Sequence, residues 1–263
     1  MAAELLFGVA GWSYADWKGV VYPANCKDTL RAVASRVGLV EVNSTFYAMP
    51  SAKNCRSWVE RTADLGTMFT AKLPQQFTHA RRFDDAMIEE ARAGFLPLAE
   101  SGRLVGLLAQ FNHELQFSAA SIELVQRLRD AFAPVAPLFV EVRHRSWNAA
   151  DGLAALARVG VGVLELDYPG MVGGFSRDVT GVRCNGTAYL RLHGRNRAWF
   201  RRGAGRDEVY DWRYSPDEVA QIWARVQRIA AAAQRTIVVA NNHFHGKAMA
   251  VVEELLAHYR AVS

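Results

Sequence analysis

The sequence is poor in the features that mark disulfide-rich, zinc-binding and membrane proteins. Only three cysteines occur among its 263 residues, Cys26, Cys55 and Cys184, and none of them forms a CxxC pair. An odd number of widely spaced cysteines argues against a disulfide framework and a zinc knuckle, and a reducing cytosol is their simplest setting. No apolar run approaches the roughly 20 residues that a membrane-spanning helix needs. We therefore expect a cytoplasmic protein with no membrane partner.

Several common enzyme motifs are also missing. The chain has no GxGxxG, no Walker loop and no nucleophile elbow, and GAG at 203–205 does not make a phosphate loop. The opening stretch, MAAELLFGVAGWS, has no basic segment before its apolar residues and is interrupted by Glu4, so it indicates a first strand rather than a signal peptide. What is present is a chain with 51% hydrophobic residues and a formal charge of +5. That composition supports a sizeable core, and the mildly basic balance permits an anionic ligand.

Short apolar runs alternate with helix-length amphipathic segments along the chain. The runs are LLFGVAGW (5–12), LVEVNSTF (39–46), MFTAKL (68–73), RLVGLLAQF (103–111), LFVEVR (138–143), VGVLELD (161–167), TAYLRLHG (187–194) and TIVVANN (236–242). Strand-length runs separated by helices indicate βα units and a parallel sheet. Eight units in about 250 residues are typical of a closed barrel. We predict an α/β fold, a TIM-like (β/α)8 barrel formed by one domain over residues 1–263.

Helix start and stop signals support this pattern and show one irregular unit. Ser118 is a predicted N-cap, and Ser215, Pro216 and Glu218 form a predicted capping box with proline in the first turn. The helix that begins near residue 28 is expected to end on Gly38. Residues 168–186 are rich in glycine and have no helical period. We therefore expect the sixth helix of the barrel to be missing or irregular.

The strand VEVRH (140–144) alternates apolar and charged residues. If Val140 and Val142 face the helices, Glu141 and Arg143 point into the barrel near the carboxyl end of the strand. The same alternation in the other runs gives Glu41, Asn43, Lys72, Gln110, Glu165, Asp167, Arg191, His193, Asn241 and Asn242. Barrel enzymes carry their chemistry at that end of the strands. A purely internal pairing, such as Glu141 with Arg191, is the structural alternative.

The chain resembles the DUF72 (YecE-like) family over nearly its full length. The matching stretches are GWSYADWKGVVYP (11–23), VEVNSTFYAMPS (40–51), FTAKLPQQFTHARRF (69–83), VEVRHRSW (140–147), YLRLHG (189–194) and NNHFHGKA (241–248). The segment 107–117 differs, because relatives tend to have QxPPxF there. The resemblance implies a TIM-like barrel and supplies no reaction, since the family has no assigned chemistry.

The polar residues at the strand ends suggest an enzyme acting on a small anionic substrate. Glu41 and Glu141, or Asp167, would serve as general acid and base, and His193 would shuttle protons. The predicted substrate-binding residues are Trp12, Asn43, Lys72, His79, Arg143, Arg191, Asn241 and Asn242. The reaction would be hydrolysis or isomerisation of a phosphorylated or carboxylated compound. A sugar phosphate or a phosphodiester in nucleic acid is one version.

Two alternatives stay open at this point. The alternative to an enzyme is a non-catalytic protein that binds nucleic acid or a small anion through the arginines and aromatics of residues 195–206. The structural alternative for that loop is a solvated basic segment. No cofactor is predicted. A divalent metal is the lesser possibility, because Glu41, Glu141, Asp167 and His193 could converge, but Arg143 and Arg191 would repel a cation there. The HxH pair of His243 and His245 is weak evidence by itself.

Overall fold

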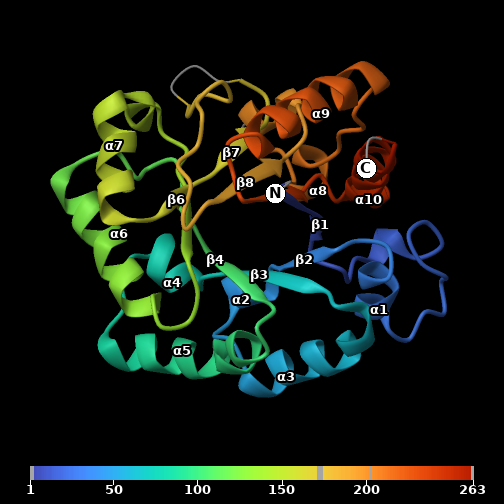
Figure 1. Ribbon diagram of the computed structural model, residues 1–263, viewed down its shortest axis with the longest axis horizontal. Coiled ribbons are helices and arrows are strands. Elements are labelled where there is room, and N and C mark those ends of the chain that lie inside the picture. The colour runs from blue at the N-terminus through green and yellow to red at the C-terminus, as the bar shows by residue number, and fades with distance from the viewer. Residues whose placement is uncertain (1–2, 171–173, 202, 262–263) are drawn as a thin grey trace.

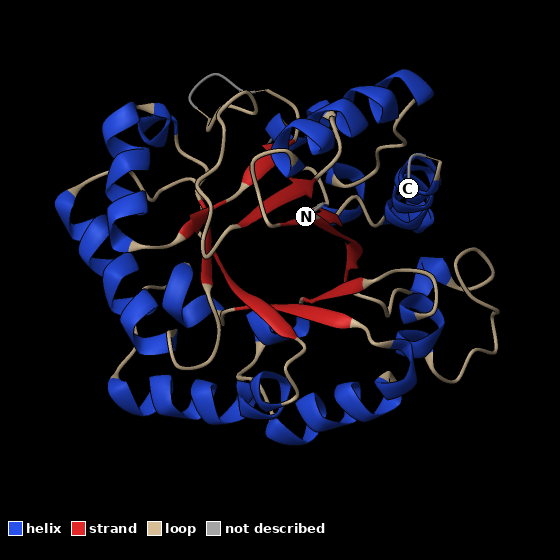
Figure 2. Cartoon of the chain, in the orientation of Figure 1, coloured by secondary structure: helices blue, strands red, loops and turns tan. Residues whose placement is uncertain are grey.

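A ring of parallel strands surrounded by helices forms the protein (Figure 2). The computed structural model describes residues 3–170, 174–201 and 203–261. The strands are β1 (Glu4–Ala10), β2 (Leu39–Val42), β3 (Met68–Lys72), β4 (Leu104–Gln110), β5 (Leu138–Glu141), β6 (Gly162–Val163), β7 (Glu165–Asp167), β8 (Thr187–Leu192) and β9 (Arg235–Ala240). Their order in the sheet is β6-β5-β4-β3-β2-β1-β9-β8-β7.

Strands β6 and β7 are two halves of one apolar run, interrupted at Leu164. Because β6 pairs with β5 and β7 pairs with β8, this run lies between the two ends of the sheet order and completes the ring. The nine strands therefore correspond to the eight predicted runs, and the predicted TIM-like barrel is confirmed. Figure 1 shows β6 and β7 one after the other along the ring, with β8 next to β7.

Helices lie around the outside of the ring and in the loops that follow its strands. They are α1 (Thr29–Ala34), α2 (Ser44–Tyr47), α3 (Ala52–Arg61), α4 (Gln75–Thr78), α5 (Asp85–Glu100), α6 (Ala119–Phe132), α7 (Ala150–Val159), α8 (Arg206–Val209), α9 (Pro216–Ala230) and α10 (Lys247–Arg260). Ser118 caps α6, and Ser215 and Glu218 form the predicted capping box of α9. The predicted end of the first helix is wrong. Helix α1 stops at Ala34, and Gly38 instead joins the sheet by donating its N–H to Phe7 O at 3.1 Å.

The sixth helix is missing, as the sequence predicts. Between β7 and β8 the described residues, 168–170 and 174–186, contain no helix. This segment instead folds back along the strands, because Val182 bridges to Val163 and Cys184 bridges to Thr187. The outer wall of the barrel at β7 and β8 is therefore covered by this segment and by α9.

Strand register decides which side chains enter the barrel. Neighbouring residues paired in register point to the same face of a sheet. Arg191 pairs with Val239, Glu41 pairs with Thr70, and Gln110 pairs with Glu141, so these side chains share the interior. Outside, Phe7 packs against Trp223 of α9 and Tyr259 of α10.

The sixth strand runs with the opposite alternation from the one predicted. Leu166 pairs with Arg191 and so faces the interior, whereas Glu165 and Asp167 pair with Leu190 and Leu192 and face outward. The expectation that Asp167 joins the other carboxylates inside the barrel is therefore wrong. Both acidic residues still avoid an unpaired buried charge, because arginines on the outer side neutralise them.

None of the helices formed by the described residues is both long enough and apolar enough to cross a membrane.

Two helical glycines give a test of this packing. Helix glycine to alanine substitution normally stabilises by about 1 kcal/mol. At Gly94 of α5 an added Cβ would lie 2.1 Å from Pro50 O, whereas at Gly152 of α7 the nearest atom would be 3.4 Å away. We expect Gly94→Ala to lower the free energy of unfolding by about 1–3 kcal/mol, measured by urea denaturation. Gly152→Ala is the control and should be neutral or stabilising. Equal effects of the two substitutions would contradict the close contact.

Candidate active site

A buried arginine joins two buried glutamates inside the barrel. Arg191 of β8 donates from Nη2 to Glu41 Oε1 of β2 at 2.7 Å and from Nη1 to Glu141 Oε2 of β5. All three side chains have no exposed surface. Three separate strands therefore place one cation between two anions, and this ion cluster is the centre of the site. The structural pairing of Glu141 with Arg191 that the sequence left open is present.

Neutral polar groups complete the hydrogen bonds of this cluster. Tyr189 donates its hydroxyl to Glu41 Oε2 at 2.6 Å and lies 3.0 Å from Thr70 Oγ1. Gln110 Oε1 accepts from Arg191 Nη1 at 3.0 Å. Burial would by itself lower the pKa of Arg191, but the two carboxylates outweigh it and raise the pKa, so the guanidinium stays charged.

A second arginine connects the cluster to the surface. Arg143 donates from Nε to Glu141 Oε1 at 2.8 Å, and its guanidinium lies over the ring of Trp199 at 4.9 Å. Its side chain is 15% exposed. Burial would raise the pKa of Glu141, but Arg143 and Arg191 hold it well below its usual value. Glu141 is therefore kept ionised and is unsuited to donate a proton.

His193 lies next to Glu141 but stays neutral. Its Nε2 is 3.4 Å from Glu141 Oε1, and its Nδ1 is 3.0 Å from Asn241 Nδ2. Burial lowers the pKa of His193 to about 4, although Glu141 acts in the opposite direction. An imidazole with this pKa does not change charge near neutral pH. This environment favours a neutral hydrogen-bonding role over the proton shuttle expected from the residue type alone.

The polar barrel interior around Glu141, Arg143, Arg191 and His193 is called the chamber. Lys72 of β3 lies in it and has no hydrogen-bond partner or ion pair among the described residues. The side chain is buried, and its Nζ lies 5.7 Å from the centre of the Phe46 ring. Burial, together with the Arg191 charge, lowers the pKa of Lys72 to about 7, although Glu41 and Glu141 oppose the shift. His79 packs edge-on against the same Phe46 ring, with 4.8 Å between the ring centroids. Burial, together with the Arg143 charge, lowers the pKa of His79.

An aromatic cover closes the chamber. Trp199 of a short helical turn (Arg197–Phe200) packs edge-on against His193 at 5.6 Å and against Tyr210 at 5.4 Å. Its Nε1 is buried and makes no hydrogen bond with the described residues. Asn43 Oδ1 and Arg191 Nε are also buried and make no hydrogen bond with the described residues. Buried polar atoms without partners are rare in folded proteins and are typical of places where a ligand or water binds.

A small cleft opens beside the chamber at the first and second strand ends. Its volume is about 220 Å³, and it is lined by Gly11, Trp12, Ser13, Tyr14, Asn43, Ser44 and Tyr47. Trp12 packs edge-on against Trp58 at 5.5 Å, so it forms part of the wall, while Tyr47 is 58% exposed. This cleft brings two of the predicted substrate-binding residues, Trp12 and Asn43, close together.

Three predicted residues or groups lie elsewhere. Asp167 is on the outer wall, where Arg195 Nη2 donates to its Oδ2 at 2.7 Å. Asn242 donates to Trp212 O at 2.8 Å and so anchors the segment after β8. Within the basic loop, Arg201 pairs with Glu208 at the surface, and Arg202 lies outside the described residues.

Sequence reasoning missed the neutral members of the site. Tyr189, Thr70 and Phe46 all contact it. Trp199, which the sequence offered only as one of the aromatics of the basic loop, packs against His193. The alternation that predicts Arg191 and His193 inside the barrel also applies to Tyr189, two residues earlier on β8. Nothing in the local sequence distinguishes Trp199, because its position depends on how the loop folds back.

Within the part of the chain that the structure describes, no group of three or more histidine, cysteine, aspartate or glutamate side chains is arranged to hold a metal ion. The carboxylates Glu41 and Glu141 are already hydrogen-bonded to guanidinium groups. A cation would therefore have to displace these guanidinium groups in order to bind the two carboxylates.

Comparisons with known proteins agree with the fold and the predicted family. A family model described as "Protein of unknown function DUF72" matches residues 6–262. The UPF0759 protein YunF of Bacillus subtilis is 24% identical over 260 residues, covering 93% of this chain and 90% of the relative. A DUF72 family protein of Thermotoga maritima has a TM-score of 0.87 at 29% identity, covering 98% of this chain and 99% of that one. D-Psicose 3-epimerase of Clostridium cellulolyticum has a TM-score of 0.53 at 13% identity, covering 98% and 99%, which shows a shared fold alone.

Removing the charge of Glu141 tests the buried ion cluster. In Glu141→Gln, two guanidinium groups keep only one full counter-charge, Glu41, inside the barrel. Breaking a buried pair in this way costs about 3–5 kcal/mol of unfolding free energy. The control is Asp64→Asn, which removes a pair with Arg31 whose partners are 62% and 46% exposed and should change stability little. Both are measured by urea unfolding followed by circular dichroism. Equal unfolding midpoints would contradict the buried network.

Lys72→Met tests whether the buried amine is uncharged. The unfolded chain has a lysine pKa near 10.5 and the folded chain one of about 7, so between these values only the unfolded state holds the extra proton. Wild-type stability should therefore rise with pH across this window, while below pH 7 it carries the full penalty of a buried ammonium. Each unit of difference between the folded and unfolded pKa corresponds to about 1.4 kcal/mol. We therefore expect the free energy of unfolding of Lys72→Met to exceed that of the wild type by about 3–5 kcal/mol below pH 7. Chemical denaturation from pH 6 to 10 should show this advantage shrinking. A constant difference across the range would show that Lys72 has an ordinary pKa.

Proposed function

The chain belongs to the DUF72 family, whose description names no activity, and we propose from its own side chains that it is an enzyme. The proposed reaction moves a proton at a carbon next to a carbonyl group in a small anionic substrate. The substrate would bind at the carboxyl end of the barrel, where Lys72, Arg143 and His193 meet. This is an isomerase type of reaction.

The state of Lys72 carries this proposal. A buried lysine without an ion pair destabilises the fold, so packing alone gives no reason for it. With a pKa of about 7, roughly half of the amine is uncharged at neutral pH and able to accept a proton. A general base is most effective when its pKa is close to the working pH. Strongly shifted pKa values of this kind are concentrated at active sites.

Arg143 supplies the binding charge for an anionic substrate. It is the cation of the chamber with partial exposure, and the ring of Trp199 and the Glu141 carboxylate fix its orientation. A guanidinium binds carboxylate or phosphate in a bidentate manner. Arg191 and Glu41, which have no exposed surface, would act by positioning Arg143 and Lys72 rather than by touching the substrate.

His193 would stabilise the oxygen that becomes negative when the proton leaves carbon. A neutral imidazole can donate its N–H to a developing oxyanion without giving up the proton, because its pKa of about 4 shows that it is not charged. Asn241 holds the ring at Nδ1. The predicted roles of Asn241 and His193 thus become orientation and oxyanion stabilisation.

The surroundings favour proton transfer over hydrolysis. Trp199 and Tyr210 pack together beside His193 and would limit the access of water to a bound substrate, which would protect a carbanion-like intermediate. Hydrolysis would also need an acid for the leaving group, and Glu141 is held in its ionised form. The cleft at Trp12, Asn43 and Tyr47 is suited to stack and hydrogen-bond the hydroxylated part of a sugar-like substrate.

Non-catalytic binding of an anion is the competing function. The unpartnered polar atoms of Asn43 and Trp199 would serve a binding protein as well as an enzyme. A nucleic-acid ligand would rely on the exposed basic loop, whose Arg201 is already paired with Glu208. Affinity for nucleic acid would then fall steeply with salt.

Proton exchange with solvent tests the enzyme proposal directly. The protein is incubated in D₂O with aldoses, ketoses, their phosphates and 2-oxo acids, and deuterium entering carbon is followed by NMR. We expect exchange in at least one anionic compound, with kcat/KM rising with pH and levelling above about 7 as Lys72 loses its proton. Lys72→Met should reduce exchange by about 10²–10⁴-fold.

The matched control is Lys53→Met, which removes an exposed lysine of α3 and should leave exchange unchanged. Exchange that persists at wild-type rate in Lys72→Met would overturn the proposed base. Saturable binding of a compound by calorimetry, with no exchange in any compound of the panel, would favour the binding protein instead.

A further inference from the structure

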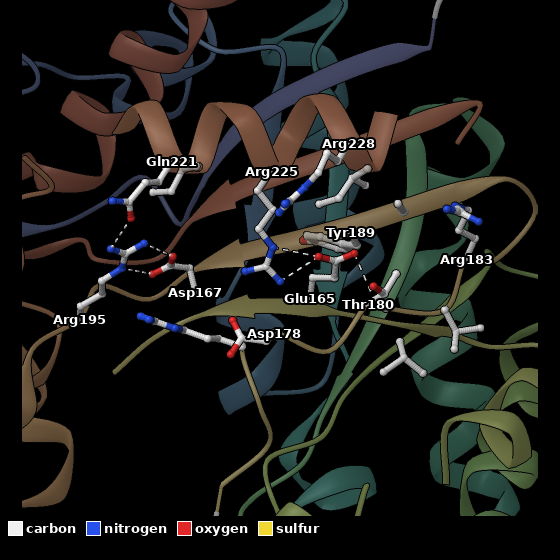
Figure 3. Close-up of a pocket in the computed structure, with 17 residues that line it drawn as sticks. Glu165, Asp167, Asp178, Thr180, Arg183, Tyr189, Arg195, Gln221, Arg225 and Arg228 are labelled. Atoms are coloured by element: carbon white, nitrogen blue, oxygen red, sulfur yellow. Dashed lines mark hydrogen bonds and ion pairs between the residues drawn. The ribbon is translucent and has the colours of Figure 1, made fainter. Parts of the chain in front are cut away.

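We infer that the outer wall of the barrel holds a second binding site, separate from the chamber, for a phosphorylated metabolite. A cavity of about 580 Å³ lies where a sixth helix would cover the strands in a regular barrel. Its walls are the outer face of β7 and β8, residues 177–183 and one side of α9 (Figure 3). This volume is within the range of small-molecule sites in proteins.

The missing helix explains why the cavity exists. A helix packed on β7 would bury the side chains that point outward from that strand, and here residues 177–183 form only an open border. The floor keeps apolar patches from Val163, Val182, Ala188, Ile222 and Ile229. An organic group attached to a charged one can therefore lie against this floor.

Arginines dominate the charged lining. The cations are Arg177, Arg183, Arg195, Arg225 and Arg228, and the anions are Glu165, Asp167 and Asp178. Arg225 pairs with Glu165 at 2.8 Å, and Arg195 pairs with Asp167 at 2.7 Å. Arg177, Arg183 and Arg228 make no hydrogen bond or ion pair with any described residue. The three positive charges of these arginines and the negative charge of Asp178 give the lining a net charge of +2.

Part of the lining is already fixed in position. Arg225 also donates to Leu166 O at 3.0 Å, so its guanidinium is held by both backbone and carboxylate. Arg228 follows three residues later on α9 and lies on the same face of the helix, and Gln221 precedes it by about two turns. Figure 3 shows Gln221, Arg225 and Arg228 extending from this one helix toward the cavity. A helix therefore presents a row of hydrogen-bond donors with one unpaired cation in it.

A phosphate monoester matches this lining better than other common ligands. Near neutral pH it carries between one and two negative charges and accepts several hydrogen bonds, which suits unpaired guanidinium groups. The hydroxyl of Thr180 and the amide of Gln221 add neutral partners. A cation would be repelled by the net positive charge. The apolar floor then receives the organic part of the ester.

The site is distinct from the chamber inside the barrel. Glu165 and Asp167 point outward from β7, while Leu166 between them faces Arg191 inside. A ligand in the cavity is thus separated from Lys72 by the strand wall. Arg195 borders the cavity four residues before Trp199, which covers the chamber.

Calorimetry with phenyl phosphate tests this inference, because the probe joins a phosphate to an apolar ring. We expect saturable binding to the wild-type protein and at least 10-fold weaker binding to Arg228→Ala and to Arg183→Ala. Phenol, which lacks the phosphate, should bind at least 10-fold more weakly than phenyl phosphate. Neither arginine has an ion pair with the residues that the structure describes, so melting temperatures close to wild type should show that both variants fold.

Two control variants separate this site from other sources of binding. Arg158→Ala removes an exposed arginine of α7 and should leave the affinity unchanged, which excludes a general effect of net charge. Arg143→Ala removes the partly exposed cation of the chamber, and the phenyl phosphate binding that depends on Arg228 should persist in this variant. Absence of saturable binding, or binding that is lost in Arg143→Ala and retained in Arg228→Ala, would overturn the inference without bearing on the chemistry of Lys72.

Discussion

The interior of the barrel depends on one buried cation, Arg191, and on the two glutamates that neutralise it. Without Glu41 and Glu141 the guanidinium would lie unpaired in a low-dielectric interior, which costs far more than a folded domain can tolerate. Because the three residues come from β8, β2 and β5, the ion cluster forms only when the ring of strands is complete. Charge pairing and barrel closure are therefore coupled in this protein.

The same cluster sets the chemistry around it. Arg191 and Arg143 keep Glu141 ionised, and the Arg191 charge adds to burial in lowering the pKa of Lys72. The groups that make the interior stable are thus the groups that leave Lys72 partly uncharged. A stable ion network and a reactive amine are consistent with each other because the network uses both glutamates and leaves none to pair with Lys72.

Shared architecture says little about what such a site does. The barrel is similar in fold to a sugar epimerase, but at 13% identity that likeness extends to the arrangement of strands and helices. Function in this fold lies in the side chains at the strand ends and in the loops that follow them. Here the loop after β8 brings Trp199 over the chamber, and the irregular segment before β8 leaves an arginine-lined cavity on the outer wall.

The sequence by itself determined the barrel, the family, the missing sixth helix and most of the buried charges, because period-two alternation and glycine-rich gaps are local properties. It correctly placed Glu41, Glu141 and Arg191 together, since the strands that carry them follow one pattern. Only the tertiary structure decided that Asp167 faces outward, because the face of a strand depends on its register with its neighbours. It also decided that His193 is neutral and that Lys72 is partly uncharged. The reason is that a pKa depends on burial and on charged side chains from strands that are distant in the sequence.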